Sequence, residues 1–293
     1  MTHAGIVTVA GKPNAGKSTL LNRIVGEKLA IVSSKPQSTR DRVVGIRTTA
    51  DVQMVIYDTP GLLNPRYALQ RAMRSSAVEA LDDADVILHV VDATEGTVMD
   101  LQEAAGLDRR PSAPVILVLN KADALDAAAV ERLRAEHPHA HLISAVTGKG
   151  VDALLQEAAQ HLPESPFLYP EDEISTQTLR FFVSEMIRET ALEQLQDEVP
   201  YSVACEVEEY REDRSPVYIR AVIYVERDSQ KGILIGAKGQ RLRDIGRQAR
   251  LKIESFTDTS VYLDLWVKVL PNWRRHEASL KRFGYRLPET PAT

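Results

Sequence analysis

Gly11-Lys12-Pro13-Asn14-Ala15-Gly16-Lys17-Ser18 follows the apolar run Ile6–Ala10 and precedes the helix-compatible segment Thr19–Val25. This is the GxxxxGK[ST] pattern in the strand, loop and helix context that a phosphate-binding loop requires. Its glycines let successive backbone N–H groups point at phosphate oxygens, Lys17 supplies charge to the outer phosphates, and the Ser18 hydroxyl can ligate Mg²⁺. An ordinary glycine turn has no need of the flanking strand and helix, so the stretch predicts a nucleotide site from Gly11 through Thr19.

The length of 293 residues predicts two domains, each large enough to bury a core. The sequence contains no apolar run of about 18 residues, and Met1–Gly5 has no signal or transit pattern, so we expect a cytoplasmic protein. The single cysteine, Cys205, excludes an internal disulfide and suits a reducing compartment. A net charge of -5 argues against wholesale nucleic-acid binding, although local charge matters more than the sum.

Apolar runs typical of strands alternate with amphipathic segments up to about residue 162. The predicted strands are Val52–Tyr57, Val86–Val91, Val115–Leu119 and His141–Ile143, and the predicted helices are Ala68–Leu81, Met99–Leu107, Ala127–Glu136 and Val151–Leu162. This alternation predicts an α/β domain with a mostly parallel sheet covered by helices on both faces. Ligands bind such sheets at the carboxyl ends of the strands, so chemistry is expected there.

Two stretches near the phosphate loop are candidates for holding Mg²⁺. Ser33–Asp41 is a polar loop without periodicity, and its Thr39 is a candidate ligand when a γ-phosphate is present, although most loop threonines have no such role. Asp58-Thr59-Pro60-Gly61 follows a predicted strand, so Asp58 is placed to hold the metal and Gly61 lets a backbone N–H approach the γ-phosphate. The predicted metal residues are therefore Ser18, Thr39 and Asp58.

Asn120-Lys121-Ala122-Asp123 follows the next strand and matches the NKxD pattern. Guanine presents two adjacent donors, N1–H and the N2 amine, and one carboxylate can accept both, whereas adenine presents no such pair. Asp123 therefore predicts guanine selectivity, because a polar group left unpaired costs affinity. Ser144-Ala145-Val146 follows the last predicted strand and can place the Ala145 N–H near guanine O6.

These motifs, in this order at strand ends, resemble the translation-factor-like class of GTPases that includes Ras. One residue departs from Ras: Leu62 stands where Ras-like proteins have the glutamine that orients the attacking water. A hydrophobic residue is usual there in the related TrmE, Era and septin group, and Asn14 matches the asparagine that some potassium-stimulated members use to bind K⁺. The predicted catalytic residues are Lys17, Thr39, Gly61 and Asn14, with the alternative that Asn14 only shapes the loop.

Two other clusters have simpler interpretations. His137, His139 and His141 have a spacing that can bind metal, but no nearby cysteine or acid completes a set, and a loop entering a strand explains them. Glu171-Asp172-Glu173 lies in a proline-marked segment and is interpreted as solvated.

Three prolines, Pro163, Pro166 and Pro170, mark a domain boundary, and a different order of elements follows it. The predicted elements are a helix at Thr178–Leu195, strands at Ser202–Tyr210 and Val217–Val225 joined by an acidic hairpin turn, helices at Gln230–Leu234 and Gln240–Ser255, and a strand at Val261–Val269. Between the last two helices lies Gly236-Ala237-Lys238-Gly239, a GxxG pattern. This order matches a type II KH domain of α+β class, which clamps about four nucleotides of single-stranded RNA.

Basic residues around the GxxG pattern strengthen the RNA interpretation. Lys231–Lys252 carries seven bases against one acid, Asp244. The predicted RNA-binding residues are Gly236, Ala237, Lys238, Gly239, Lys231, Arg241, Arg243 and Arg247. Aromatic and basic residues also alternate in Pro271–Glu277 and Lys281–Tyr285, where they suit either RNA stacking or packing on the domain.

The combination of this GTPase domain with a GxxG-bearing KH domain resembles the bacterial Era family over nearly the whole chain. The stretches that carry the resemblance include Lys35–Arg40, Val225–Gly232 and Leu265–Val269, although the commonest family form has threonine where Ser38 stands. The implied domains are 1–163 GTPase, 164–174 linker, 175–270 KH and 271–293 basic and aromatic tail.

The resemblance implies a GTP-hydrolysing, Mg²⁺-dependent switch that binds the 3′ end of small-subunit ribosomal RNA and assists assembly of the 30S subunit. It also implies a cytoplasmic protein, in some members peripheral at the inner face of the cell membrane, and we expect a monomer. The alternative is a GTPase whose KH-like domain recognises protein, as in double-GTPase relatives that lack GxxG. An ATP-driven enzyme is a third interpretation, and Asp123 opposes it.

Overall fold

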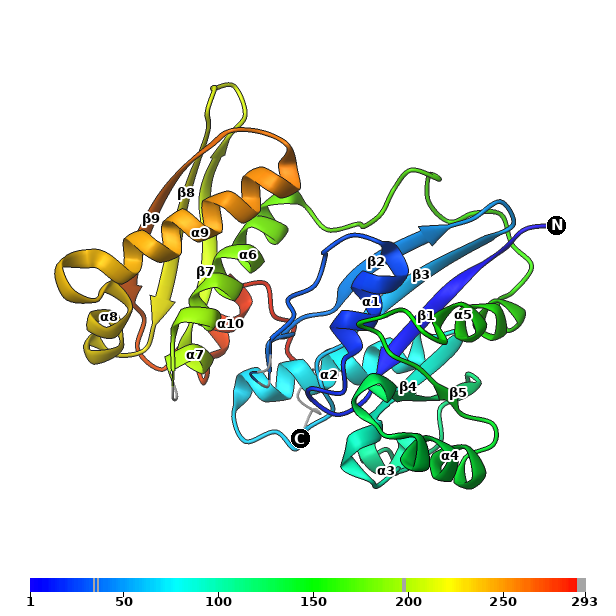
Figure 1. The fold of residues 1–293 in the computed structure, drawn as a ribbon. Helices are drawn as coiled ribbons and strands as arrows, with labels where there is room; N and C mark the ends of the chain where they lie inside the picture. The colour runs from blue at the N-terminus through cyan, green and yellow to red at the C-terminus, as the bar shows by residue number, and fades with distance from the viewer. Residues whose placement is uncertain (34, 36, 197–198, 289–293) are drawn as a thin grey trace. The chain divides into compact units, whose positions relative to one another are not determined.

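The structure, a computed structural model, describes residues 1–33, 35, 37–196 and 199–288. It contains two compact units (Figure 1): one comprises Met1–Arg66 and Gln70–Thr176, and the other begins at Gln177 and takes in Tyr67–Leu69. Ser34 and Pro36 of the predicted polar loop and residues 289–293 of the predicted tail lie outside the described residues. Within the described part of the chain, no helix is long and apolar enough to cross a bilayer.

A six-stranded sheet in the order β2-β3-β1-β4-β5-β6 forms the first unit. Its strands are β1 (His3–Ala10), β2 (Val43–Thr48), β3 (Val52–Asp58), β4 (Val86–Asp92), β5 (Val115–Asn120) and β6 (His141–Leu142), and its helices are α1 (Lys17–Val25), α2 (Ala68–Asp82), α3 (Leu101–Ala105), α4 (Ala127–Glu136) and α5 (Val151–Gln160). Only β2 is antiparallel to its neighbour. The predicted α/β class with a mostly parallel sheet is confirmed.

The central strands are nearly continuous apolar runs because helices cover parallel sheets on both faces. Val7 and Val9 of β1 and Ile87 of β4 are fully buried, and α2 and α3 contribute to one apolar cluster with Ile87. Since β1, β3 and β5 run in the same direction, their carboxyl ends bring the phosphate loop, Asp58 and Asn120 to one edge of the sheet.

The edge strand β2 was not predicted from the sequence, because Gly45 and Arg47 interrupt its apolar pattern. A Cβ on Gly45 would lie 2.7 Å from Cδ1 of Leu21, so the glycine allows α1 to pack closely on this strand. The end of the predicted linker and Ser175, predicted as the first residue of the KH domain, both lie along β2. The Ile46 N–H donates to Ile174 O over 2.8 Å, and the Ser175 hydroxyl donates to Val44 O over 2.5 Å. These residues therefore belong structurally to the first unit.

The second unit contains a three-stranded sheet in the order β7-β8-β9. Its elements are α6 (Leu179–Gln194), α7 (Val199–Ser202), β7 (Ala204–Arg211), β8 (Val217–Val225), α8 (Asp228–Ile235), α9 (Gln240–Thr257), β9 (Val261–Val269) and α10 (Glu277–Arg282). The pair β7 and β8 is an antiparallel hairpin, and β8 and β9 are parallel. The predicted strands 217–225 and 261–269 are confirmed, as is the α+β KH fold.

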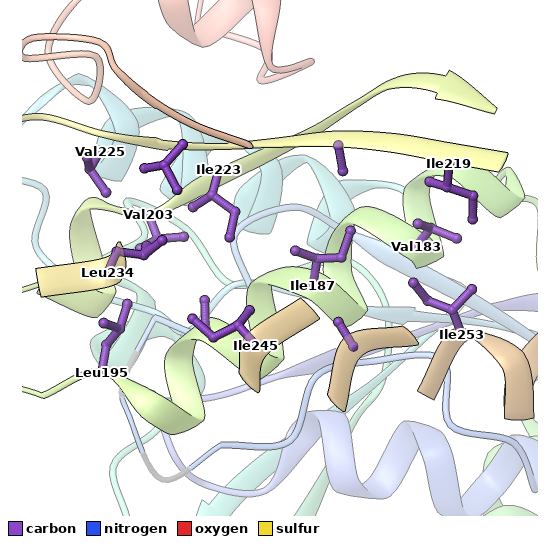
Figure 2. Close-up of a cluster of buried hydrophobic side chains, with 14 of the residues drawn as sticks. Val183, Ile187, Leu195, Val203, Ile219, Ile223, Val225, Leu234, Ile245 and Ile253 are labelled. Carbon is purple, nitrogen blue, oxygen red and sulfur yellow. The ribbon is translucent and has the colours of Figure 1, made fainter. Parts of the chain in front are cut away.

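Alternation along β8 builds the core of this unit. Figure 2 shows Ile219, Ile223 and Val225 on one face of the strand, facing Val183 and Ile187 of α6 and Ile245 and Ile253 of α9. Cys205 packs against the same cluster, and burial raises the pKa of its thiol, so this cysteine is an apolar core residue.

The segment after β9 packs on the domain. Trp273 is fully buried, its Nε1–H donates to Ser202 O over 2.8 Å, and its ring meets Phe283 edge to face at 5.2 Å. The sequence suited either RNA stacking or packing on the domain for this segment, and the side chains of Trp273 and Phe283 pack on the domain.

Candidate functional sites

The phosphate loop joins β1 to α1, and its backbone conformation explains its glycines. Gly11 has φ +152° and Gly16 has φ +94°, both outside the region that other residues favour. A Cβ on Gly11 would lie 2.1 Å from Val90 O, and one on Gly16 would lie 2.2 Å from Asn120 Nδ2. Any other residue at these positions would push the loop away from the sheet edge.

Lys17 is buried at the start of α1 and is bonded to the loop that precedes it. Its Nζ donates to the carbonyl oxygens of Gly11 over 3.1 Å and Lys12 over 2.9 Å. Burial lowers the pKa of Lys17 to about 8, although the nearby Asp58 carboxylate raises it. The ammonium group is thus held inside the loop, where it can meet an anionic ligand.

Ser18, Thr39 and Asp58 come together although they lie far apart in sequence. The Ser18 hydroxyl lies 2.6 Å from Oδ2 of Asp58 and 2.9 Å from the Thr39 hydroxyl, and the Thr39 hydroxyl lies 3.4 Å from the same Oδ2. Burial raises the pKa of Asp58 to about 6, while Lys17 and the two hydroxyl groups lower it. Asp58 Oδ1 is buried with no hydrogen-bond partner among the described residues.

This set fits a hard divalent cation. Hydroxyl and carboxylate oxygens are the ligands that Mg²⁺ prefers, and it is commonly held by one carboxylate together with phosphate oxygens. An orphaned carboxylate oxygen in a buried position is unfavourable unless a cation or a donor meets it.

A cavity of about 310 Å³ opens beside these groups. Its lining contains residues predicted for the nucleotide site: Pro13, Asn14, Gly16, Lys17, Ser18, Thr19, Thr39, Gly61 and Lys121. The cavity is also lined by residues that were not predicted to belong to the nucleotide site: Ile31, Val32, Ser33, Gln37 and Ser38. Their apolar and small polar side chains carried no signal of phosphate chemistry, and only the fold brings them here.

Gly61 and Leu62 lie against the phosphate loop. A Cβ on Gly61 would lie 2.7 Å from the backbone nitrogen of Pro13, and the Leu62 N–H donates to Gly11 O over 3.0 Å. The Leu62 side chain is buried in the apolar cluster of α2 and α3, so it does not face the cavity. Thr59 is also buried and donates to Val9 O over 2.9 Å, which fixes this turn to β1.

Asn120 links the phosphate loop to the predicted base-binding loop. Its Nδ2 donates to Ala15 O over 2.9 Å, and its Oδ1 accepts the Ala145 N–H over 2.9 Å. The Ala145 N–H, predicted from the sequence to lie near guanine O6, is bonded to Asn120 in the structure. Ser144 Oγ accepts the Thr147 N–H over 3.1 Å and so shapes the loop.

Lys121 and Asp123 lie at the same edge of the sheet. Lys121 adopts a left-handed conformation with φ +68°, and its ammonium lies 2.5 Å from Oδ2 of Asp92. Burial raises the pKa of Asp92, but hydrogen bonds from Lys121 and Thr94 outweigh it and keep the pKa below its usual range. Asp123 is exposed on the turn after Lys121. Asp92 was not predicted to belong to this site, although an acidic residue directly after a predicted strand indicates a position at the edge of the sheet where ligands bind.

A second cavity, of about 530 Å³, lies between α9 and β9 in the second unit. Its lining comprises Gly239, Leu242, Arg243, Gly246, Arg247 and Arg250 of α9 and its start, and Val261, Tyr262, Leu263 and Leu265 of β9. We call it the α9–β9 groove. It joins apolar and aromatic surface to three arginines, a combination that suits nucleobases and phosphates.

The predicted RNA residues divide between the groove and its approach. Gly239, Arg243 and Arg247 line the groove, whereas Gly236 and Lys238 shape the loop before it, with φ +71° and +51°. Ala237 lies in this loop and Lys231 on α8, and neither lines the groove. Arg241 Nη1 donates to Ile233 O over 2.5 Å, so its part in RNA binding stays a prediction. Arg250 and Tyr262 also line the groove but were not among the residues predicted to bind RNA, although Arg243, Arg247 and Arg250 follow helical spacing on one face.

The side chains of the histidine series and the acidic triplet do not gather into a set of metal ligands among the described residues. His141 Nε2 lies 2.7 Å from Oε2 of Glu157, and no group of three or more His, Cys, Asp or Glu side chains suited to a metal occurs in the part of the chain that the structure describes.

Comparisons with known proteins agree with both units. Residues 6–121 match the family model described as 50S ribosome-binding GTPase, and residues 198–274 match the KH domain model. The GTPase Era of Carboxydothermus hydrogenoformans is 41% identical over 290 residues, covering 96% of this chain and 97% of that protein. The GTPase Era of Pseudomonas fluorescens is 42% identical over 292 residues, covering 97% of each.

Two solved structures are also similar. A crystal structure of Era in complex with MgGDPNP and nucleotides 1506–1542 of 16S ribosomal RNA matches with a TM-score of 0.91 and 38% identity, covering 98% of this chain and 100% of that one. A variant of Aquifex aeolicus Era bound to GDP and AlF4⁻ matches with a TM-score of 0.90, the same identity and the same coverage.

Proposed function

The chain belongs to the Era family of GTPases, and on that premise we propose that it is a GTP-driven switch that binds the single-stranded 3′ end of small-subunit ribosomal RNA and assists assembly of the 30S subunit. The observation that carries the proposal is the α9–β9 groove beside an intact GxxG loop. The similar Era structure holds a 16S ribosomal RNA fragment, which supports the same ligand class here.

We propose that the nucleotide lies across the edge of the first sheet. Backbone N–H groups of residues 14–19 and the Lys17 ammonium would bind the phosphates, and Asp123 would accept two hydrogen bonds from guanine. Ser18, Thr39 and Asp58 would hold Mg²⁺, whose charge offsets the negative charge of the phosphate oxygens.

Hydrolysis needs a group that orients the attacking water, and Leu62 does not supply one. We propose that Asn14, which lines the nucleotide cavity with φ +64°, helps to hold K⁺ beside the phosphates. Turnover in KCl and in NaCl at equal ionic strength tests this proposal. We expect faster hydrolysis in KCl and loss of the difference in Asn14→Ala, whereas equal turnover in both salts for the unaltered chain would overturn it.

The switch requires that the two nucleotide states differ in RNA affinity, because a ligand that binds both states equally shifts neither. We propose that GTP orders the loops around Thr39 and Gly61 and that this state favours RNA binding, with release after hydrolysis. Identical RNA affinity in the presence of GDP and of a non-hydrolysable GTP analogue would refute this step.

We also propose that the protein acts in the cytoplasm as a monomer, with peripheral association at the inner face of the membrane. Membrane flotation and light scattering of the purified chain test these two statements.

Sequencing of RNA crosslinked to the chain in cells tests the main proposal. We expect reads concentrated at the 3′ end of the small-subunit RNA, and loss of crosslinking in Gly236→Asp, because a side chain there meets Arg241 Cβ at 2.8 Å and distorts the GxxG loop. Lys238→Glu tests charge at the same loop, and Arg132→Glu, at an exposed position on α4 of the first unit, makes the same change of charge outside the KH domain. Unchanged crosslinking in both loop variants would favour a KH-like domain that recognises protein.

A further inference from the structure

The loop of residues 144–149 must present backbone donors to a base, but little apolar surface holds it. Val146 is 64% exposed, so burial does not anchor the middle of the loop. Internal hydrogen bonds close it at its ends: Gly148 N–H donates to Ser144 O over 2.8 Å, and Ser144 N–H donates to Lys149 O over 2.9 Å. Between these ends the Ala145 N–H is bonded to Asn120 and the Thr147 N–H to Ser144, which leaves the carbonyl groups of Ala145 and Val146 to be held by another partner.

Arg23 of α1 supplies that partner. Its Nε donates to Ala145 O over 3.1 Å, and its Nη2 donates to Val146 O. The guanidinium therefore holds two successive carbonyl groups of the loop. It also lies beside Gly148, whose Cα would carry a Cβ 3.8 Å from Nε of Arg23. A planar guanidinium is suited to this double contact because its donors have fixed directions.

Holding these carbonyls determines where the neighbouring N–H groups point. In a trans peptide the C=O and N–H groups point in opposite directions, so the bond to Ala145 O turns the Val146 N–H away from Arg23. The Ala145 N–H is bonded to Asn120, and the Val146 N–H has no partner among the described residues. Val146 therefore presents the unused donor of this segment of the loop.

We propose that Arg23 is a positioning residue for guanine recognition: it fixes the loop so that the Val146 N–H meets the O6 of a 6-oxopurine nucleotide. This inference rests on the proposed guanine site at Asp123. Because α1 also carries Lys17 and Ser18, Arg23 ties the base-binding loop to the helix that begins at the phosphates.

Three nucleotides separate this role from that of Asp123. GDP presents O6 and the N2 amine, 6-thio-GDP keeps both donors but replaces O6 by sulfur, a weaker acceptor, and IDP keeps O6 but lacks the N2 amine. Dissociation constants of all three are measured for the unaltered chain and for Arg23→Met, which keeps the aliphatic stem but has no donor.

We expect Arg23→Met to weaken GDP binding about tenfold, the range for lost hydrogen bonds to a charged group. The preference for GDP over 6-thio-GDP should fall toward unity, because the O6 donor is no longer held in place. The preference for GDP over IDP should stay unchanged, because Asp123 is intact. Arg23→Lys should recover part of the affinity, since one ammonium reaches one carbonyl.

Arg47→Met is the matched control. Arg47 also donates to a carbonyl of α1, Ile24 O, over 2.8 Å, but it does not contact the base-binding loop. Arg47→Met should leave unchanged both the preference for GDP over 6-thio-GDP and the preference for GDP over IDP. Equal weakening of all three nucleotides by Arg23→Met, or no change in the preference over 6-thio-GDP, would overturn the inference. An unaltered chain that does not prefer GDP to IDP would instead count against the proposed role of Asp123.

Discussion

The Ser18 hydroxyl donates a 2.6 Å hydrogen bond to Oδ2 of Asp58, while the other carboxylate oxygen, Oδ1, has no hydrogen-bond partner among the described residues. The pair joins the start of α1 to the end of β3 and leaves one buried oxygen available to a cation. It is the structural basis for the magnesium site that we propose.

Magnesium affinity should depend on the ionisation of Asp58. Burial raises the pKa of this group to about 6, and a protonated carboxyl group competes with the metal. We expect Mg²⁺ affinity of the GDP complex to fall about tenfold per pH unit below pH 6 and to level off above it. Mg²⁺ titrations between pH 5 and 8, corrected for the affinity of free GDP, measure this dependence. A flat corrected profile would contradict it.

Asn120→Ala should lower both stability and nucleotide affinity. The change leaves the buried Ala145 N–H and Ala15 C=O without their partner, at a cost of about 1–3 kcal/mol for each group. Urea unfolding without nucleotide measures the change in stability, and the dissociation constant of GDP measures the change in nucleotide affinity. Asn120→Asp keeps the acceptor for Ala145 but places a buried carboxylate oxygen against Ala15 O, so it should be no more stable than Asn120→Ala. An Ala variant as stable as the unaltered chain would show that the loops are held independently.

Gly61→Ala should displace the phosphate loop. The new Cβ would lie within 2.8 Å of the Pro13 backbone, which cannot move without moving the loop. We expect about tenfold weaker nucleotide binding or more, the effect of a clash of about 1–3 kcal/mol. Gly232→Ala is the control, because a Cβ at that helical position meets nothing within 4 Å. Equal GDP affinity in the two variants would be inconsistent with the close contact.

Leu62→Gln should not create a fast GTPase. The side chain occupies an apolar cluster with Leu81, Ile87 and Leu101, so the amide would be buried away from the cavity. We expect a loss of about 1–3 kcal/mol in the free energy of unfolding and no gain in turnover. Leu62→Met, similar in volume, should preserve stability. Single-turnover hydrolysis decides the point: acceleration in the glutamine variant would mean that this side chain reaches the phosphates.

The sequence predicted what local pattern and chain order determine. The phosphate loop, Asp58 and Asn120 each follow an apolar strand, and parallel strands carry such residues to one edge, so their meeting could be foreseen. It did not predict β2, whose glycine and arginine hide the strand pattern, or the hydrogen bonds that hold residues 174 and 175 along that strand.

Contacts made by tertiary packing could not be predicted from the sequence either. Arg23 has an ordinary exposed position on a helix, and nothing in its neighbourhood indicates that it reaches Ala145 in a distant loop. The donation of the Ala145 N–H to Asn120 likewise depends on two loops whose separation only the fold determines. Tyr262 was read as one more strand residue, because its place beside α9 follows from the pairing of β8 with β9.

Trp273 has a consequence for synthesis. It lies after β9, is fully buried, and is held by Ser202 and Phe283, so the domain that carries the GxxG loop is completed by residues translated after its sheet. A ribosome that stalls after residue 270 would hold a chain with a finished nucleotide-binding unit and an unfinished RNA-binding one. Truncated products would therefore be able to bind nucleotide without a properly folded output domain, and their exposed apolar surface would mark them for degradation.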